Sequence, residues 1–254
     1  MRLRRGERRY GALVWLSAGS WIAALAASGG IPRTAPDLGG LAATLITSLF
    51  AVALCATVGL QAGAELALGG AGRGAQAVRS FLQAAAAIPS VALGAALVIA
   101  WSDLGRLPSG VWLAAFGLGL LNLPIAVLQV AEAFAQHGVI ADAALALGAD
   151  AAQAARAVFP AARAEVARSL LLVVGRSLGE AGLVALLAGP LAAHGVGAVR
   201  AGATLAAGLW YLEMQGRIGT AQAFWPIVLL LALSALAAAA AALFGEGRQE
   251  GLTR

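Results

Sequence analysis

Long uninterrupted runs of apolar residues are the feature of this sequence that most limits its fold. A helix needs about 20 such residues to cross the hydrocarbon of a bilayer. Suitable windows occur at 10–27, 41–68, 78–101, 111–136, 164–190 and 224–244. The chain of 254 residues is 61% hydrophobic and only 11% charged, far outside the composition of a soluble domain. We therefore expect an all-α integral membrane protein with about six transmembrane helices.

The first window has two interpretations. A basic start, an apolar stretch and small residues are typical of a signal peptide, but a retained helix puts both termini on one side of the membrane. Most arginines then fall on that side, and four fall on the other: Arg33, Arg106, Arg200 and Arg217. We expect the helix to be retained and, by the positive-inside rule, both termini to be cytoplasmic.

The charged and metal-binding residues exclude several kinds of function. All 17 basic residues are arginine, so the chain has no phosphate-binding loop with its lysine, and another chain must bind any nucleotide. The net charge of +5 sits at the membrane flanks, which fits orientation in a bilayer better than binding to nucleic acid. Cys55 is the only cysteine, and His137 and His194 are far apart in sequence. We expect no enzymatic activity, metal or cofactor in this chain.

One apolar run carries two charges at its middle. In "LLLVVGRSLGEAGLVALLAGP", Arg176 and Glu180 are four residues apart, so on a continuous helix they share a face and can pair. Each charged side chain costs about 2.5 to 3.5 kcal/mol of insertion free energy at the centre of a membrane helix. Together the two charges roughly cancel the favourable insertion free energy of the aliphatic neighbours. That face therefore meets protein, water or substrate. Two interpretations stay open: a structural salt bridge, or an arginine that binds an anion and that Glu180 holds in the resting state.

Other polar and small residues are weaker signals. A stripe of glycines beside the charged pair predicts the close approach of another helix: Gly175, Gly179 and Gly182. Pro89 and Ser90 interrupt the third apolar run, where they predict either an ordinary kink or unwound backbone that lines a pathway. Asn122 in the fourth run has the same two interpretations, packing or pathway.

The connection between the fourth and fifth runs is rich in alanine, unlike an ordinary loop. Its pattern predicts two short helices. The first covers 140–147 and ends at Gly148, and the second starts with Asp150 as its N-cap and ends at Pro160. Such short helices with exposed apolar faces are suited to docking against a partner.

This segment resembles the cytoplasmic coupling motif of permease subunits in bacterial ABC importers. In "DAALALGADAAQAARAVFPAAR", the positions that match the motif are Asp142, Ala143, Ala144 and Gly148, with Pro160 closing it. The resemblance implies that the first helix fits a groove on an ATPase subunit. Asp142 stands where glutamate is usual, and the spacing from Gly148 to Pro160 is slightly short. The aspartate shortens the reach of a salt bridge to the ATPase subunit. The shorter spacing rotates the second helix slightly.

Two further motifs narrow the resemblance to phosphate-importer permeases. "AAAAIPSVALGAALVIAW" is similar to their IPS-V segment, and "GRSLGEAG" is similar to their GR-A/S-LGE segment. Molybdate and tungstate permeases favour a second proline where this chain has a serine. The resemblance implies the type I ABC-importer permease fold and a substrate pathway lined by Arg176, Glu180, Pro89 and Ser90. Asn122 is a further candidate for that pathway.

The sequence thus predicts three parts. Residues 1–40 hold a cytoplasmic tail and the first helix, 41–244 form a permease core with a coupling segment at about 137–163, and 245–254 form a cytoplasmic tail. The implied function is phosphate import across the bacterial inner membrane by alternating access, driven by ATP-Mg on two ATPase subunits. A second, related permease subunit and a periplasmic or lipid-anchored phosphate-binding protein are implied as well. The alternatives are a permease for molybdate, tungstate or sulfate, and a non-transporting membrane scaffold.

Overall fold

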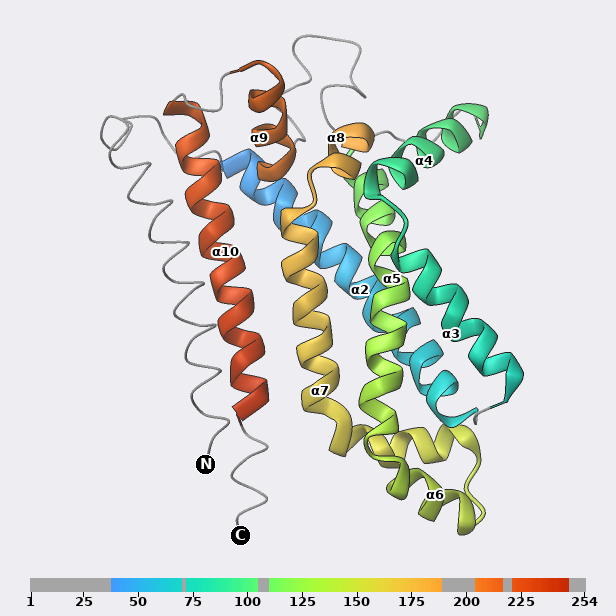
Figure 1. Cartoon of the computed structure of the whole chain (residues 1–254). Coiled ribbons are helices and arrows are strands. Elements are labelled where there is room, and N and C mark those ends of the chain that lie inside the picture. Colours follow the sequence, from blue (N-terminus) through green and yellow to red (C-terminus); the bar gives the residue numbers. More distant parts are fainter. Residues whose placement is uncertain (1–37, 70–71, 105–109, 189–203, 217–220, 247–254) are drawn as a thin grey trace.

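The computed structural model describes residues 38–69, 72–104, 110–188, 204–216 and 221–246, and these form an all-α bundle (Figure 1). The helices of the described part are α2 (Leu38–Leu68), α3 (Arg73–Ala86), α4 (Ser90–Leu104), α5 (Val111–Ala135), α6 (Gly138–Ala146), α7 (Ala151–Gly179), α8 (Gly182–Ala188), α9 (Leu205–Met214) and α10 (Ala221–Glu246). The first predicted transmembrane helix, at 10–27, lies outside the described residues.

Three helices of the described part are long and apolar enough to cross a membrane: α2, α5 and the stretch Ala223–Ala241 of α10. Two bent pairs, α3 with α4 and α7 with α8, meet the same criterion when each pair is taken as one span, which gives up to 5 spans. These spans correspond to the five predicted runs that fall in the described residues. The prediction of a multi-pass, all-α membrane protein is therefore confirmed.

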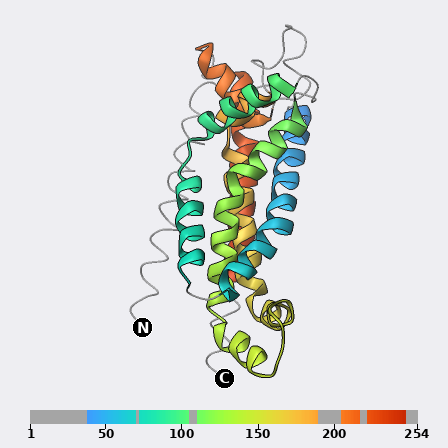
Figure 2. The same cartoon turned by 90° about the vertical axis from the view of Figure 1, so that its right-hand side faces the viewer.

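The central helix of the bundle is α5, which contacts α2, α3, α4, α7 and α8. Its closest partner is α2. Gly59 packs against Ala126 and Gly63 packs against Val130, so the two helices run in the same direction. A Cβ atom on Gly63 would lie only 2.7 Å from Val130 Cβ, so glycine is what allows the two backbones to approach. In Figure 2, α2 and α3 lie on opposite sides of α5.

The third predicted run, 78–101, is not one straight helix. It is divided into α3 and α4, which meet at an angle of 93°. Pro89 explains the division, because it has no N–H to donate and disfavours helical backbone at the residue before it. Its carbonyl accepts from Leu93 N at 3.1 Å, so α4 begins directly after the proline. The interruption predicted at Pro89 and Ser90 is thus a bend of 93° between two separate helices.

The second half of the fold corrects two further predictions. Pro160 was expected to end a short helix, but it lies inside the 29-residue α7. Figure 1 shows that α7 first runs along the end of the bundle where α6 lies and then rises through it, and a proline inside a helix produces such a bend. The run 164–190 was expected to be one helix, but α7 ends at Gly179, and α8 follows at an angle of 64°.

Short helices cover both ends of the bundle. The helices α4, α8 and α9 lie at one end, and α6 lies at the other (Figure 1). The first turn of α9 is buried and is tied to α2, because Thr44 Oγ1 accepts from Leu205 N at 2.9 Å. Thr204 caps the same helix by accepting from Ala207 N at 3.3 Å. We call the two ends of the bundle the α9 end and the α6 end.

Candidate functional site

The two helix breaks of the bundle meet beside α8. Gly182, the first residue of α8, packs against the start of α4, where a Cβ atom on it would lie 2.8 Å from Val91 Cγ2. The same point is 3.7 Å from Ser90 Oγ and 3.8 Å from Glu180 Oε1. Ser90 and Glu180 therefore both border the bare backbone of Gly182. The structure brings together these two predicted pathway residues, with Pro89 directly before Ser90.

Glu180 occupies the break between α7 and α8. Its backbone is extended, with ψ of 104°, and its N–H donates to Ser177 O at 3.4 Å. Its Oε1 accepts from Leu183 N at 3.5 Å, which directs the half-buried carboxylate toward the first turn of α8. The Glu180 side chain thus accepts a hydrogen bond from the backbone at the start of α8.

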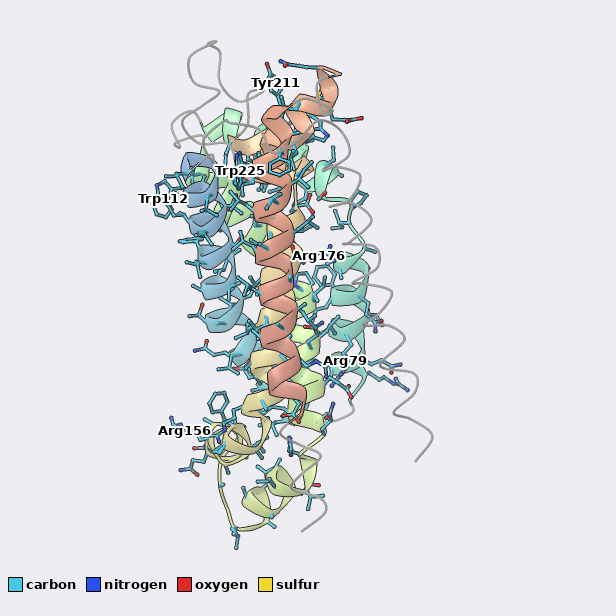
Figure 3. The ribbon with its side chains drawn as sticks, turned by 90° about the vertical axis from the view of Figure 1, so that its left-hand side faces the viewer. Arg79, Trp112, Arg156, Arg176, Tyr211 and Trp225 are labelled. Carbon is cyan, nitrogen blue, oxygen red and sulfur yellow. The ribbon has the colours of Figure 1, made fainter. Side chains whose placement is uncertain are left out.

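The predicted pairing of Arg176 with Glu180 is absent. Among the described residues, the only basic and acidic side chains within 4 Å of each other are His137 and Glu165, and Arg176 is exposed near the last turn of α7 (Figure 3). The pairing was predicted for a continuous helix, on which residues four apart share a face. Because α7 ends at Gly179, Glu180 leaves that face. Arg176 is therefore a cation without an acidic partner in the described part of the chain.

The glycine stripe beside Arg176 is divided between two environments. Gly182 packs closely on α4, as predicted. Cβ atoms on Gly175 and Gly179 would meet no heavy atom of the described chain within 4 Å. The close approach predicted there is not made by any described helix of this chain.

Asn122 contacts a different side of α7 from the one that carries Arg176. It is fully buried, and its Nδ2 donates to Leu118 O at 2.9 Å and to Ser177 Oγ at 3.1 Å. Its Oδ1 accepts no hydrogen bond from the described residues. Ser177 is itself buried, while the neighbouring Arg176 is exposed. Asn122 therefore joins α5 to α7 in the interior and does not share the exposed surface of Arg176.

The predicted coupling segment projects from the α6 end of the bundle. Ala141 anchors α6 in a buried cluster with Phe134, Val158 and Ala162. The residues that match the coupling motif, Asp142, Ala143, Ala144, Gly148 and Pro160, are exposed except for Ala144, which is half-buried.

Two large apolar side chains of this segment are almost fully exposed. Val139 is 83% exposed and Leu147 is 89% exposed. Both lie at the ends of α6, on the short helix that matches the first part of the coupling motif. The segment therefore presents apolar side chains at the α6 end of the bundle.

The turn between α6 and α7 is fixed by two local motifs. Gly148 has φ of +88°, and the bonds Gly148 N to Leu145 O at 3.0 Å and Ala149 N to Ala144 O at 3.1 Å complete a Schellman motif. Asp150 then caps α7 in a capping box with Gln153. The predictions that Gly148 ends one helix and that Asp150 starts the next are confirmed.

Two residues of this region were missed by sequence reasoning. His137 precedes α6, and its Nε2 lies 3.8 Å from Glu165 Oε2 on α7, with both side chains partly buried. The pair joins the base of α6 to the rising part of α7. The only signal in the sequence is a histidine and a glutamate at opposite ends of one connection. Among the residues that the structure describes, no group of three His, Cys, Asp or Glu side chains could hold a metal ion.

Comparison with known proteins adds no family to these observations. The sequence matches no protein-family model and no curated protein.

Proposed function

We propose that the chain is the membrane-spanning permease subunit of a bacterial ABC importer for inorganic phosphate. The observation that carries this proposal is the form of α6. A short helix with a matching motif projects from the bundle, exposes Val139 and Leu147, and is held in place by the rigid turn at Gly148 and Asp150. A docking helix of this kind would transmit closure of an ATPase dimer to α7 and the rest of the bundle.

The orientation required by this proposal agrees with the charge distribution. Figure 3 shows Arg156 at the α6 end, and Arg79 donates to Leu66 O at 3.4 Å near the end of α2 on the same side. Arginine is favoured on the cytoplasmic side of a membrane protein. The α6 end would therefore face the cytoplasm, where the ATPase subunits and their ATP-Mg are found.

The transported anion would meet Arg176 between the two membrane faces. An exposed arginine on a membrane helix is costly in lipid, so its surface must be covered by protein, water or substrate. Arginine is permanently charged and presents a planar fork of donors, which suits an oxyanion. No described residue lies within 4 Å of the positions that Cβ atoms on Gly175 and Gly179 would take, which leaves room there for a second permease subunit, so that the pathway would lie between the two chains.

Two alternatives follow from the same observations. The arginine would serve molybdate, tungstate or sulfate as well as phosphate, because all are oxyanions. A non-transporting scaffold would keep the docking helix without a pathway. The lack of an ion pair between Arg176 and Glu180 favours transport, since a structural salt bridge was the main reason for a scaffold to retain both charges.

The test is ATP-driven uptake by the complete assembly in proteoliposomes. Candidates for the ATPase, the second permease and the binding protein are first sought among the neighbouring genes. We expect uptake of labelled phosphate that excess molybdate, tungstate or sulfate does not inhibit. Arg176→Gln should abolish uptake while the subunits still co-purify, and Arg176→Lys should retain part of it. Loss of assembly in Arg176→Gln would favour the scaffold, and parental uptake would remove Arg176 from the pathway.

A further inference from the structure

The exposed face of α7 carries a second arginine. Arg168, Leu172 and Arg176 are all exposed and follow one another at intervals of four residues. This spacing turns each side chain by about 40° from the one before, so the three share one side of the helix. Arg168 lies about 12 Å from Arg176 along the helix axis, toward the α6 end.

Neither arginine is neutralised within the described part of the chain. The one acidic residue of α7 is Glu165, whose carboxylate lies 3.8 Å from His137. No ion pair to Arg168 or Arg176 occurs among the described residues. Two permanent positive charges therefore stand on one face of a helix that forms part of a candidate membrane span.

Helix α3, which packs against α5, is polar on one face as well. It has no buried residue, and Gln76, Ser80 and Gln83 recur along it at intervals of four and three residues, all exposed. Figure 3 shows Arg176 and, nearer the α6 end, Arg79 on the side of α10 on which α3 lies. A face turned to lipid would be apolar, so the polar face of α3 and the arginine face of α7 each need cover by protein, water or substrate.

We infer that Arg168 is a second oxyanion-binding position, between Arg176 and the α6 end of the bundle. This inference rests on the proposed function, and it assigns Arg168 to the half of the pathway between Arg176 and the α6 end. A single strong cationic site would retain an anion, whereas two separated sites of moderate strength allow it to be passed on and released. The ligand is the free anion in transit, because the face of Arg168 is continuous with that of Arg176.

The inference is tested by equilibrium binding of labelled inorganic phosphate to the complete, nucleotide-free assembly in nanodiscs, with uptake measured in the same preparations. Arg168→Gln should weaken phosphate binding about tenfold, the expected effect of losing a charge-assisted hydrogen bond. Arg168→Lys keeps the charge without the fork and should weaken it less. Arg73→Gln removes an exposed arginine at the start of α3 and should leave binding unchanged.

Each outcome decides a different point. Unchanged phosphate affinity in both Arg168 variants would overturn the inference while leaving the proposed function intact. A fall in thermal stability that depends on phosphatidylglycerol, with unchanged phosphate affinity, would identify Arg168 as an anchor for lipid headgroups and would also overturn it. If Arg168→Gln does not fold, the phosphate affinity of Arg168→Lys decides the point: weakened binding supports the inference, and unchanged binding overturns it. An assembly that neither binds nor transports any oxyanion would overturn the proposed function and this inference together.

Discussion

Asn122 on α5 donates a hydrogen bond of 3.1 Å to Ser177 on α7, and this buried contact holds the last turn of α7 at the residue after Arg176. Because Asn122 Nδ2 also donates to Leu118 O, the amide is fixed in its orientation. The arginine and the serine are neighbours in sequence but point to different sides of the helix. The position of the exposed cation is thus set from the interior of the bundle.

The first prediction concerns this hydrogen bond. Interhelical hydrogen bonds in membrane proteins contribute about 0.6 kcal/mol on average and up to about 1.7 kcal/mol. We expect a coupling energy in that range between Asn122→Leu and Ser177→Ala, measured as a double-mutant cycle of unfolding in mixed detergent micelles. Additive effects of the two substitutions would mean that the contact does not hold α7 in place.

The second prediction concerns the contact between α2 and α5. In Gly63→Ala the new methyl group would lie 2.7 Å from Val130 Cβ and 2.9 Å from Val127 O, so the two helices must separate. We expect a loss of about 1 to 3 kcal/mol in the free energy of unfolding, as for other overpacked cores. Gly74→Ala is the control, because a Cβ atom there meets no atom within 4 Å and alanine favours the helix. Equal stability of the two variants would contradict the close packing of α2 on α5.

The third prediction concerns the turn that carries α6. Gly148 has φ of +88°, a backbone conformation that costs a residue with a Cβ atom about 1 to 2 kcal/mol. Gly148→Ala should therefore speed hydrogen exchange of the α6 amides and leave the exchange of α5 unchanged. Gly138→Ala is the matched control, since it introduces the same methyl group into open space on the same helix. Slower exchange in Gly148→Ala than in the parent would show that the turn is not under this constraint.

The parts of the fold that follow from local signals could be predicted from the sequence. Apolar runs of sufficient length give the membrane spans, because lipid leaves the backbone no partners outside the helix. Gly148 and Asp150 mark the turn after α6, because capping depends on residues only a few positions apart. Pro89 likewise marks the end of α3, although the angle of 93° also depends on how α4 packs on α8.

The parts that depend on tertiary contacts could not be predicted. The break at Glu180 contains no proline, and glycines such as Gly179 are common within membrane helices, so the sequence favours a continuous helix there. That error produced the predicted pairing of Arg176 with Glu180. The burial of Asn122 beside Ser177 joins residues that are 55 positions apart, and nothing in the sequence selects that pair.

The last prediction tests the docking role of α6. Leu147 is 89% exposed and contributes little to the fold, so Leu147→Asp should leave the thermal stability of the isolated chain unchanged. If the side chain is buried against an ATPase subunit, its burial contributes about 1.5 to 3 kcal/mol, and the substitution should weaken ATPase binding at least about tenfold. Gly72→Asp adds the same charge at the extended residue before α3 and should leave binding unchanged. Titration of the purified ATPase against the permease in nanodiscs measures both variants, and equal affinity would show that α6 does not dock through Leu147.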